Sequence, residues 1–333
     1  MADKIIEVKN LHKEFRLKQK ESGLIGGFKA VFKPNWQIVQ AVEKINFSVK
    51  RGEVLAFIGP NGAGKSTTIK MLTGILFPTS GEISVLGFNP QTERQQLAYK
   101  IGSVFGQRSQ LSMHLPAQDS YDLLSKIYEL KEVDYQERLK FLVEAFEIND
   151  LLKTPVRKLS LGQRMRCEIV ASLLHRPEVL FLDEPTIGLD VVAKQHIREV
   201  IKYLNKKEKV TIFLTSHDAG DIEALAERTI VINHGKLIYD GATDKLQQEY
   251  IKNKIIEIIT ADPIKDFSFA GGKVVNQDKY SIRVELDLAK NSIDKLLEHA
   301  LAKYNIKDIN IFDPSLEEII AAIYRSEKND TVT

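Results

Sequence analysis

Residues 59–67 constrain the fold more than any other stretch, and they read Gly-Pro-Asn-Gly-Ala-Gly-Lys-Ser-Thr. An apolar run at residues 54–58 precedes them, and Thr-Ile-Lys-Met-Leu follows at residues 68–72. This order predicts a buried strand, a glycine-rich loop and a helix. Glycines let the loop backbone curl until several N–H groups point at one centre, where the helix adds its positive end. The stretch therefore predicts a pocket for a phosphate group.

The spacing of this phosphate loop also matches G-x-x-x-x-G-K-[S/T], the motif of nucleotide hydrolases. Lys65 can reach the β- and γ-phosphates, and the Ser66 hydroxyl can lie on Mg²⁺. A glycine-rich turn with a stray lysine is the alternative, but the strand before and the helix after the loop argue against it. The residues expected to hold the nucleotide are Gly59, Asn61, Gly62, Ala63, Gly64, Lys65, Ser66 and Thr67.

Composition excludes several classes of protein. The chain has 333 residues, of which 43% are hydrophobic, so it can bury a sizeable core in one or two domains. Its net charge of +2 gives no indication of nucleic-acid binding. The single cysteine, Cys167, excludes intrachain disulfides, and we expect a buried helical thiol there. No run approaches the ~18 apolar residues of a spanning helix, and no signal peptide is apparent at the start. We therefore expect a soluble chain whose membrane role needs a partner.

Alternating strands and helices predict an α/β fold with a mainly parallel core. Short strands are expected at residues 5–8 and 41–49, and continuous apolar runs at residues 179–182 and 210–214 predict strands that are buried on both faces. A helical block of about residues 108–178 lies between the expected strands of this core.

Residues 16–39 form an unusual basic insertion, with five basic residues against one acid. Apolar residues follow helical spacing from Leu24 to Phe32, and Trp36 comes after them. A basic amphipathic helix with an aromatic end suits a membrane surface or the groove of a partner. A solvated insertion packed on its own domain is the alternative, and the sequence leaves both open.

Residues 245–333 predict a second, small α+β domain after the larger one at residues 1–244. Apolar and polar residues alternate around residues 281–288, which predicts a half-exposed antiparallel strand. One helix is expected to start near Ser292, and Ser315 with Glu318 fits a capping box for a final helix. We interpret this domain as an accessory or dimerisation module.

Further marks follow the phosphate loop along the chain: Gln107, the stretch Leu-Ser-Leu-Gly-Gln at 159–163, Asp183, Glu184, Asp190 and His217. With these marks in this order, the chain resembles the ATP-binding subunit of an ABC transporter over about residues 4–241. The resemblance implies a P-loop ABC-type ATPase core with an antiparallel β subdomain and a helical subdomain.

Three of these residues end apolar strands and carry side chains suited to phosphate chemistry. Asp183 can hold the water shell of Mg²⁺. Glu184 is the candidate general base, taking a proton from the attacking water. His217 can contact the γ-phosphate and orient Glu184. Gln107 resembles the family's hinge glutamine, which touches Mg²⁺ and moves with the helical block; Gln110 is the less favoured candidate for that position.

The stretch at residues 159–163 resembles the family signature Leu-Ser-Gly-Gly-Gln. Ser160 stands at an expected helix start, where its hydroxyl and the helix N–H groups can bind an anion. In the family, the signature contacts ATP held by the opposite subunit, and here it comprises Ser160, Leu161, Gly162 and Gln163. A homodimer or a heterodimer around two ATP is implied, with Asp190 in the loop that crosses the interface. Leu161 departs from the usual glycine, and its side chain narrows the approach to the backbone.

Adenine recognition is expected at Phe15, because the family stacks the ring on an aromatic before the second strand. A core phenylalanine is the alternative.

We predict an ATPase subunit with ATP and Mg²⁺ as cofactors, driving a separate integral membrane permease from the cytoplasmic face of the membrane. Residues 183–190 and 313–318 resemble exporter-type ATPases of the ABC-2 class, so export is favoured over import. A soluble ABC ATPase of translation or DNA repair is the alternative. A P-loop GTPase is disfavoured: Asn205 begins a weak likeness to a guanine-reading motif, and a solvated helix face is expected there.

Overall fold

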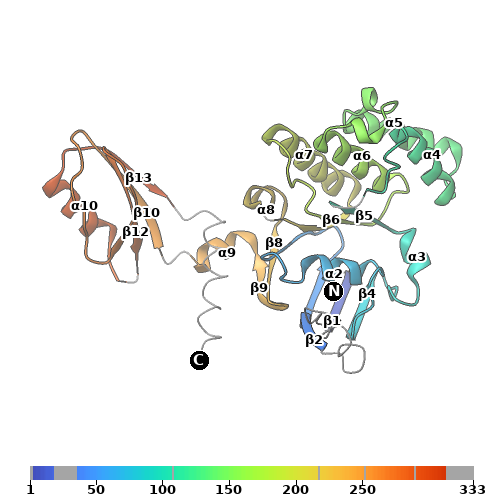
Figure 1. Cartoon of the computed structure of the whole chain (residues 1–333), viewed down its shortest axis with the longest axis horizontal. Helices are drawn as coiled ribbons and strands as arrows, with labels where there is room; N and C mark the ends of the chain where they lie inside the picture. Colours follow the sequence, from blue (N-terminus) through green and yellow to red (C-terminus); the bar gives the residue numbers. More distant parts are fainter. Residues whose placement is uncertain are drawn as a thin grey trace, which may run out of the picture. The chain divides into compact units, whose positions relative to one another are not determined.

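The computed structural model describes residues 3–18, 36–106, 109–216, 218–250, 253–288 and 290–312. It divides into two compact units, Met1–Thr243 and Asp244–Thr333 (Figure 1).

A six-stranded sheet forms the centre of the first unit, with the strand order β5-β6-β7-β3-β8-β9. Neighbouring strands are parallel except at the edge, where β9 runs antiparallel to β8. Every residue of β3 and of β7 is buried, as expected for strands covered on both faces. The predicted parallel α/β core is therefore confirmed. The strands are β3 Val54–Ile58, β5 Ile101–Phe105, β6 Val179–Asp183, β7 Thr211–Thr215, β8 Arg228–Asn233 and β9 Lys236–Ala242.

Helices connect these strands, and three of them, α4, α5 and α6, gather in the predicted helical block between β5 and β6 (Figure 1). Within the described ranges, no helix combines the length and apolarity needed to cross a membrane. The helices are α2 Lys65–Leu72, α3 Arg94–Ala98, α4 Ala117–Ile127, α5 Glu132–Ala145, α6 Leu161–Leu173, α7 Val191–Glu208 and α8 Ala219–Leu225, with short 3₁₀ turns η1 Asn149–Leu151 and η2 Val156–Lys158.

A three-stranded antiparallel sheet, ordered β2-β1-β4, forms the predicted β subdomain. Its strands are β1 Lys4–Lys18, β2 Trp36–Lys50 and β4 Ser80–Val85. The prediction of short strands was wrong, because β1 and β2 continue into both ends of the expected 16–39 insertion. The amphipathic helix predicted within residues 24–32 lies outside the described residues.

The core of this unit joins the two sheets through aromatic rings. Phe47 of β2 lies 5.7 Å from the ring centre of Phe57 in β3, and Phe57 lies 5.3 Å from Phe213 in β7. Phe181 of β6 continues the cluster at 5.7 Å from Phe213. Rings at these separations pack favourably beyond the area they bury. The cluster therefore fixes the antiparallel sheet against the parallel one beneath the phosphate loop.

The second unit contains an antiparallel sheet ordered β11-β12-β10-β13. In β12, Ile282, Val284 and Leu286 are buried and alternate with more exposed residues, as predicted. Helix α10 begins after its N-cap, Ser292, also as predicted. The final helix expected near Ser315 lies outside the described residues. The elements are β10 Asn253–Thr260, β11 Gly272–Gln277, β12 Ser281–Asp287, α10 Ile293–Lys303 and β13 Ile306–Phe312; α9, Thr243–Tyr250, spans the division between the units.

Candidate active site

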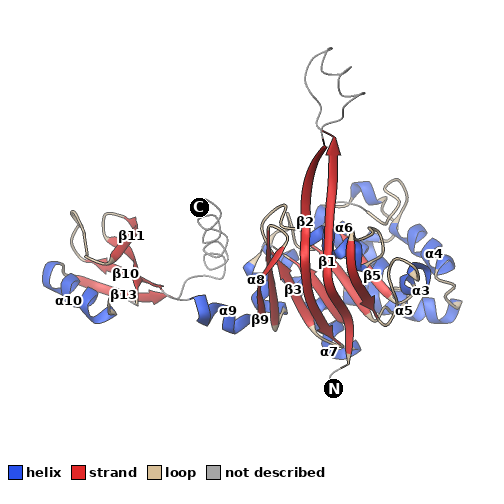
Figure 2. Ribbon diagram, turned by 90° about the horizontal axis from the view of Figure 1, so that it is seen from below, coloured by secondary structure: helices blue, strands red, loops and turns tan. Residues whose placement is uncertain are grey.

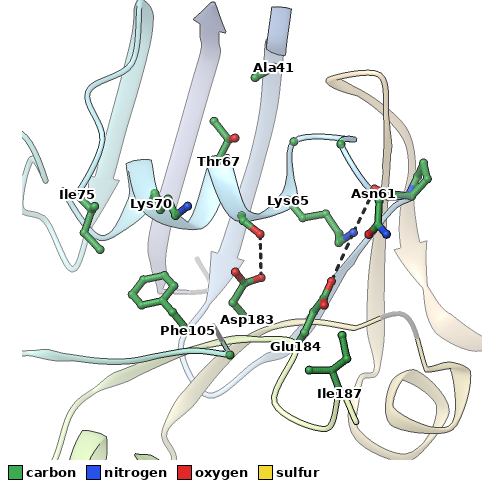
Figure 3. Close-up of a pocket in the computed structure, with 15 residues that line it drawn as sticks. Ala41, Asn61, Lys65, Thr67, Lys70, Ile75, Phe105, Asp183, Glu184 and Ile187 are labelled. Carbon is green, nitrogen blue, oxygen red and sulfur yellow. Dashed lines mark hydrogen bonds and ion pairs between the residues drawn. The ribbon is translucent and has the colours of Figure 1, made fainter. Parts of the chain in front are cut away.

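A cavity of about 350 Å³ lies at the carboxyl ends of β3 and β6 (Figure 3). The phosphate loop and the start of α2 form one wall, and the residues after β6 form the opposite wall. Eight of the predicted site residues line the cavity: Asn61, Gly62, Gly64, Lys65, Ser66, Thr67, Asp183 and Glu184. The structure thus brings together two motifs that are more than a hundred residues apart in the chain.

The phosphate loop is shaped by close backbone approaches at two glycines. A Cβ atom at Gly59 would lie 2.2 Å from the carbonyl oxygen of Ile232 in β8. At Gly64 it would lie 2.3 Å from the carbonyl oxygen of Ala41 in β2, and φ there is +110°. No side chain fits at these distances, and a positive φ favours glycine. Both residues are therefore required by the space around the loop.

Backbone hydrogen bonds also tie the loop to both sheets. The Gly235 N–H, in the turn between β8 and β9, donates to the Ala63 carbonyl at 3.0 Å. The Gly235 carbonyl accepts from the Glu43 N–H of β2 at 2.8 Å. The loop is thus held in position by main-chain contacts on both sides.

Lys65, the first residue of α2, is almost fully buried, with 5% of its surface exposed. Its amine donates to the carbonyl oxygens of Gly59 at 2.6 Å and Pro60 at 3.2 Å. The same Nζ lies 3.9 Å from Oε1 of Glu184 (Figure 3). Burial lowers the pKa of Lys65, while the charges of Glu184 and Asp183 act in the opposite direction. A cation with two carboxylates across the cavity is well placed to bind a charged phosphate chain.

Ser66 and Asp183 face each other across the cavity, with the Ser66 hydroxyl donating to Asp183 Oδ1 at 3.2 Å (Figure 3). Thr215, at the end of β7, donates its hydroxyl to the same oxygen at 2.7 Å. These hydroxyl and carboxylate oxygens are hard ligands of the kind that Mg²⁺ prefers. The pair fits the predicted magnesium role. Sequence reasoning missed Thr215, whose contribution depends on β6 and β7 being neighbours.

Glu184 follows β6 in a left-handed backbone conformation, with φ of +55°. Its N–H donates to both the carbonyl and the hydroxyl oxygen of Thr215, each at 3.1 Å. This conformation is uncommon outside glycine, and it is maintained where surrounding contacts determine it. The turn directs the Glu184 carboxylate into the cavity towards Lys65 (Figure 3).

A buried charge network behind Glu184 was not predicted. Asp221 of α8 is fully buried and accepts hydrogen bonds from the hydroxyls of Thr186 and Ser216, the latter at 2.8 Å. Arg198 of α7 donates to Asp221 through Nε at 2.7 Å, and its Nη2 reaches Asp218 at 3.0 Å. The network joins the segments after β6 and β7. The sequence shows an acidic residue near a helix start but not which strand ends it connects.

The signature residues lie at the start of α6 and outside the cavity lining. Ser160 is the N-cap: its Oγ accepts from the Gln163 N–H at 3.2 Å, and Gln163 Oε1 accepts from the Ser160 N–H at 2.9 Å. This capping box leaves the hydroxyl proton of Ser160 as a donor.

The departure from glycine at Leu161 is accommodated inside the same chain. A Cβ atom at Gly188 would lie 2.9 Å from Cδ2 of Leu161. Gly188 has a φ of +70°, so a side chain there would be strained as well. A Cβ at Gly162 would lie 3.3 Å from the Ala193 side chain in α7. The signature therefore packs beside the loop that contains Asp190, which caps α7 by accepting from the Ala193 N–H at 2.8 Å.

The other predicted site residues are less closely defined. Phe15 is half-buried in β1, where Lys13 Nζ lies 5.1 Å from its ring centre, and it is not part of the cavity lining. Gln107 and His217 lie outside the described residues. Their neighbours are described: Gly106 lines the cavity, and Ser216 donates to Asp221 in the buried network. The less favoured Gln110 donates through Nε2 to the Ser103 carbonyl at 2.6 Å.

The prediction of a solvated helix face from Asn205 to Glu208 was wrong for both of these residues. Asn205 Nδ2 donates to the carbonyl oxygens of Gly52 at 2.7 Å and Val210 at 3.0 Å. Glu208 accepts two hydrogen bonds from Arg138, which is buried, at 2.7 and 2.8 Å. These side chains anchor the end of α7, and neither lines the phosphate-loop cavity.

The parallel sheet, the phosphate loop and the paired carboxylates define a P-loop nucleotide hydrolase. The family model described as ABC transporter matches residues 42–187, which include the phosphate loop and both carboxylates. The ABC transporter ATP-binding protein NatA of Bacillus subtilis is 32% identical over 65% of this chain and 88% of its own length. The chain therefore belongs to the ABC transporter family, and it is an ATP-binding subunit that hydrolyses ATP.

Two further comparisons agree with this assignment. The linearmycin resistance ATP-binding protein LnrL of Bacillus subtilis is 31% identical over 84% of this chain and 91% of its own length. The solved structure of CbiO1 from Clostridium perfringens, part of the ABC transporter complex CbiONQ, matches with a TM-score of 0.60 and 28% identity. That match covers 74% of this chain and 92% of CbiO1. The predicted resemblance to the ATP-binding subunits of ABC transporters and the predicted fold class are confirmed.

Proposed function

We propose that Glu184 is the general base of ATP hydrolysis in this chain. The observation that supports the proposal most directly is the position of its carboxylate, 3.9 Å from Lys65 and inside the cavity lined by the phosphate loop. Lys65 would hold the β- and γ-phosphates, so that Glu184 lies beside the water that attacks the γ-phosphate. The carboxylate would take the proton of that water as the bond to phosphorus forms. His217 would orient Glu184 and contact the γ-phosphate. Gln107 would touch Mg²⁺ and move with the helical block.

Ser66 and Asp183 would hold a Mg²⁺ ion together with the phosphates. When bound, Mg²⁺ neutralises charge on the phosphate oxygens. Thr215 would keep Asp183 oriented by its 2.7 Å hydrogen bond. The Ser66 hydroxyl, which donates to Asp183 in this structure, would turn to the ion instead. The hard oxygen donors on both walls of the cavity support this role.

A second ATPase subunit would complete the site. Ser160 and Gly162 are expected to bind the γ-phosphate, yet they lie outside the cavity of their own chain. Four apolar side chains in the signature and close to Asp190 in the chain are exposed: Leu161, Ile187, Val191 and Val192. Exposed apolar residues next to a functional loop are typical of a protein interface. A homodimer or a heterodimer with a similar chain would cover them and supply the missing signature.

A separate integral membrane permease would receive the motion of this dimer at the cytoplasmic face of the membrane. CbiO1 is part of a transporter complex, which supports a permease partner for this chain. LnrL is named for resistance to linearmycin, and a relative with a resistance role favours export over import here. Gln107 and the helical block of α4 to α6 would carry the motion, and the second unit would act as an accessory or dimerisation module.

The test is the variant Glu184→Gln, which keeps shape and removes the base. Turnover should fall about 100-fold or more, while ATP binding is retained because Lys65 and the loop are unchanged. Glu178→Gln is the matched control, since Glu178 precedes the opposite end of β6 and pairs with Arg51 at 2.7 Å. Steady-state phosphate release and ATP affinity should be measured for both variants. Wild-type turnover in Glu184→Gln would remove Glu184 from this role.

A further inference from the structure

The two long strands β1 and β2 continue beyond the three-stranded sheet as a two-stranded ribbon. The last pair between β1 and β4 is His12 with Ser80, whereas β1 and β2 stay paired as far as Lys18 with Trp36. From Lys13 to Lys18 the ribbon measures roughly 17 Å at the usual rise of a strand. Figure 2 shows both strands running past the other elements of the first unit.

The ribbon presents apolar side chains to solvent. All residues from Trp36 to Gln40 are exposed, with Trp36 at 54% and Ile38 at 56% of their surfaces. On β1, Leu17 is 53% exposed. A two-stranded ribbon with this much exposed apolar surface has little stability of its own. These residues belong to none of the buried core clusters found among the described residues, so no described part of the unit covers this end of the ribbon.

The register sorts these side chains onto two faces. Residues directly opposite each other in an antiparallel pair point to the same side of the sheet. Arg16 lies opposite Ile38, two residues from Trp36 on the same face; Arg16 is 70% exposed, with Glu14 Oε1 3.4 Å from its guanidinium. Such an exposed ion pair is weak and leaves the guanidinium able to bind other anions. One face therefore combines apolar and cationic side chains.

The opposite face is apolar too, because Leu17 and Val39 alternate with the residues of the first face, and Val39 lies opposite Phe15. A flat protein surface would cover one side of such a ribbon and leave the other in water. An interfacial layer of lipid headgroups would surround both sides.

We propose that this ribbon docks on an anionic lipid surface, with Trp36, Ile38 and Leu17 entering the headgroup layer and Arg16 on the lipid phosphates. Tryptophan is favoured at membrane interfaces, and cationic side chains near the surface add attraction to anionic lipids. The charge of the sequence agrees, since residues 16–39 hold five basic residues against one acid. The chain thus has its own contact with the membrane, in addition to the one expected through a permease.

Trp36 provides a direct probe because it is the single tryptophan of the chain. The purified full-length protein should be titrated with vesicles of phosphatidylcholine alone and with vesicles that also contain phosphatidylglycerol. We expect the tryptophan emission to shift to shorter wavelength with the anionic vesicles, to shift less with the neutral ones, and to return towards its original position at high salt. Unchanged emission with anionic vesicles would overturn the proposal.

Two variants keep the probe and weaken the contact. Ile38→Ser should lower vesicle affinity about tenfold by removing buried apolar surface. Arg16→Gln should lower it about fivefold by removing one cation near the lipid. The matched controls are Val133→Ser and Lys140→Gln on α5, both at exposed positions, and neither should change vesicle affinity. Equal losses in variants and controls would contradict the proposal. A second result would also contradict it: ribbon variants that keep their vesicle affinity but no longer capture the permease in detergent. The partner of the ribbon would then be a protein.

Discussion

The buried carboxylate of Asp221 allows a sharp test of how the catalytic end of the sheet is held together. Asp221 is fully buried and accepts from Arg198 Nε at 2.7 Å, from Ser216 Oγ at 2.8 Å and from the Thr186 hydroxyl. Asp221→Ala would leave two hydroxyls without this acceptor, together with the guanidinium of Arg198, whose side chain is 15% exposed and which would keep only Asp218. Breaking a buried ion pair from one side costs about 3–5 kcal/mol. We expect a loss of that size in the free energy of unfolding of the first unit.

The assay is denaturant unfolding followed by far-ultraviolet circular dichroism. Because the chain has two compact units, the variant should move the transition of one unit and leave the other in place. Asp240→Ala is the matched control, since Asp240 makes a similar two-bond pair with Arg228, at 2.6 and 2.8 Å, but is partly exposed. Its cost should be about 1 kcal/mol or less. If Asp221→Ala costs no more than Asp240→Ala, the buried network does not stabilise the unit.

Three other predictions concern pH, the phosphate loop and adenine binding. Burial lowers the pKa of His175 to about 4, so the unfolded chain binds a proton before the folded chain does as pH falls from 7. The free energy of unfolding should therefore drop by roughly 3 kcal/mol towards pH 4. In denaturant titrations, His175→Phe should remove this part of the pH dependence. Gly64→Ala should abolish binding of a fluorescent ATP analogue because its Cβ meets Ala41, whereas Gly62→Ala, with open space around it, should cost only about 1–2 kcal/mol of backbone strain; equal losses in the two would refute the steric argument. Phe15→Ala should weaken ATP binding about tenfold and Phe15→Tyr should retain it, since stacking needs only a ring face; unchanged affinity in Phe15→Ala would end that role.

The sequence was sufficient for the parallel core because its strands are buried on both faces. Runs such as residues 54–58 and 179–182 are continuous and apolar, and they formed β3 and β6 nearly as expected. The half-exposed strand β12 was equally readable from its alternation. In contrast, the outer parts of β1 and β2 face solvent on both sides, so neither pattern applies to them.

The site was predictable where one motif carries its own chemistry. Lys65, Ser66, Asp183 and Glu184 could be placed from their local context, and they meet in one cavity. Thr215 and Asp221 could not, because their contributions depend on which strand ends are neighbours. The order of β6 and β7 in the sheet is a tertiary fact that a single sequence does not contain.

The nucleotide cavity and the exposed ribbon share one strand, β2, and this has a geometric consequence. Ala41 lines the nucleotide cavity, and Trp36 begins the same strand, about 17 Å away at the usual rise. Strands stretch very little, so β2 acts as a spacer of fixed length between the two sites. A surface that holds Trp36 would set the height at which the nucleotide sits above it. Any motion that ATP drives in the loop would then take place at a fixed distance from that surface.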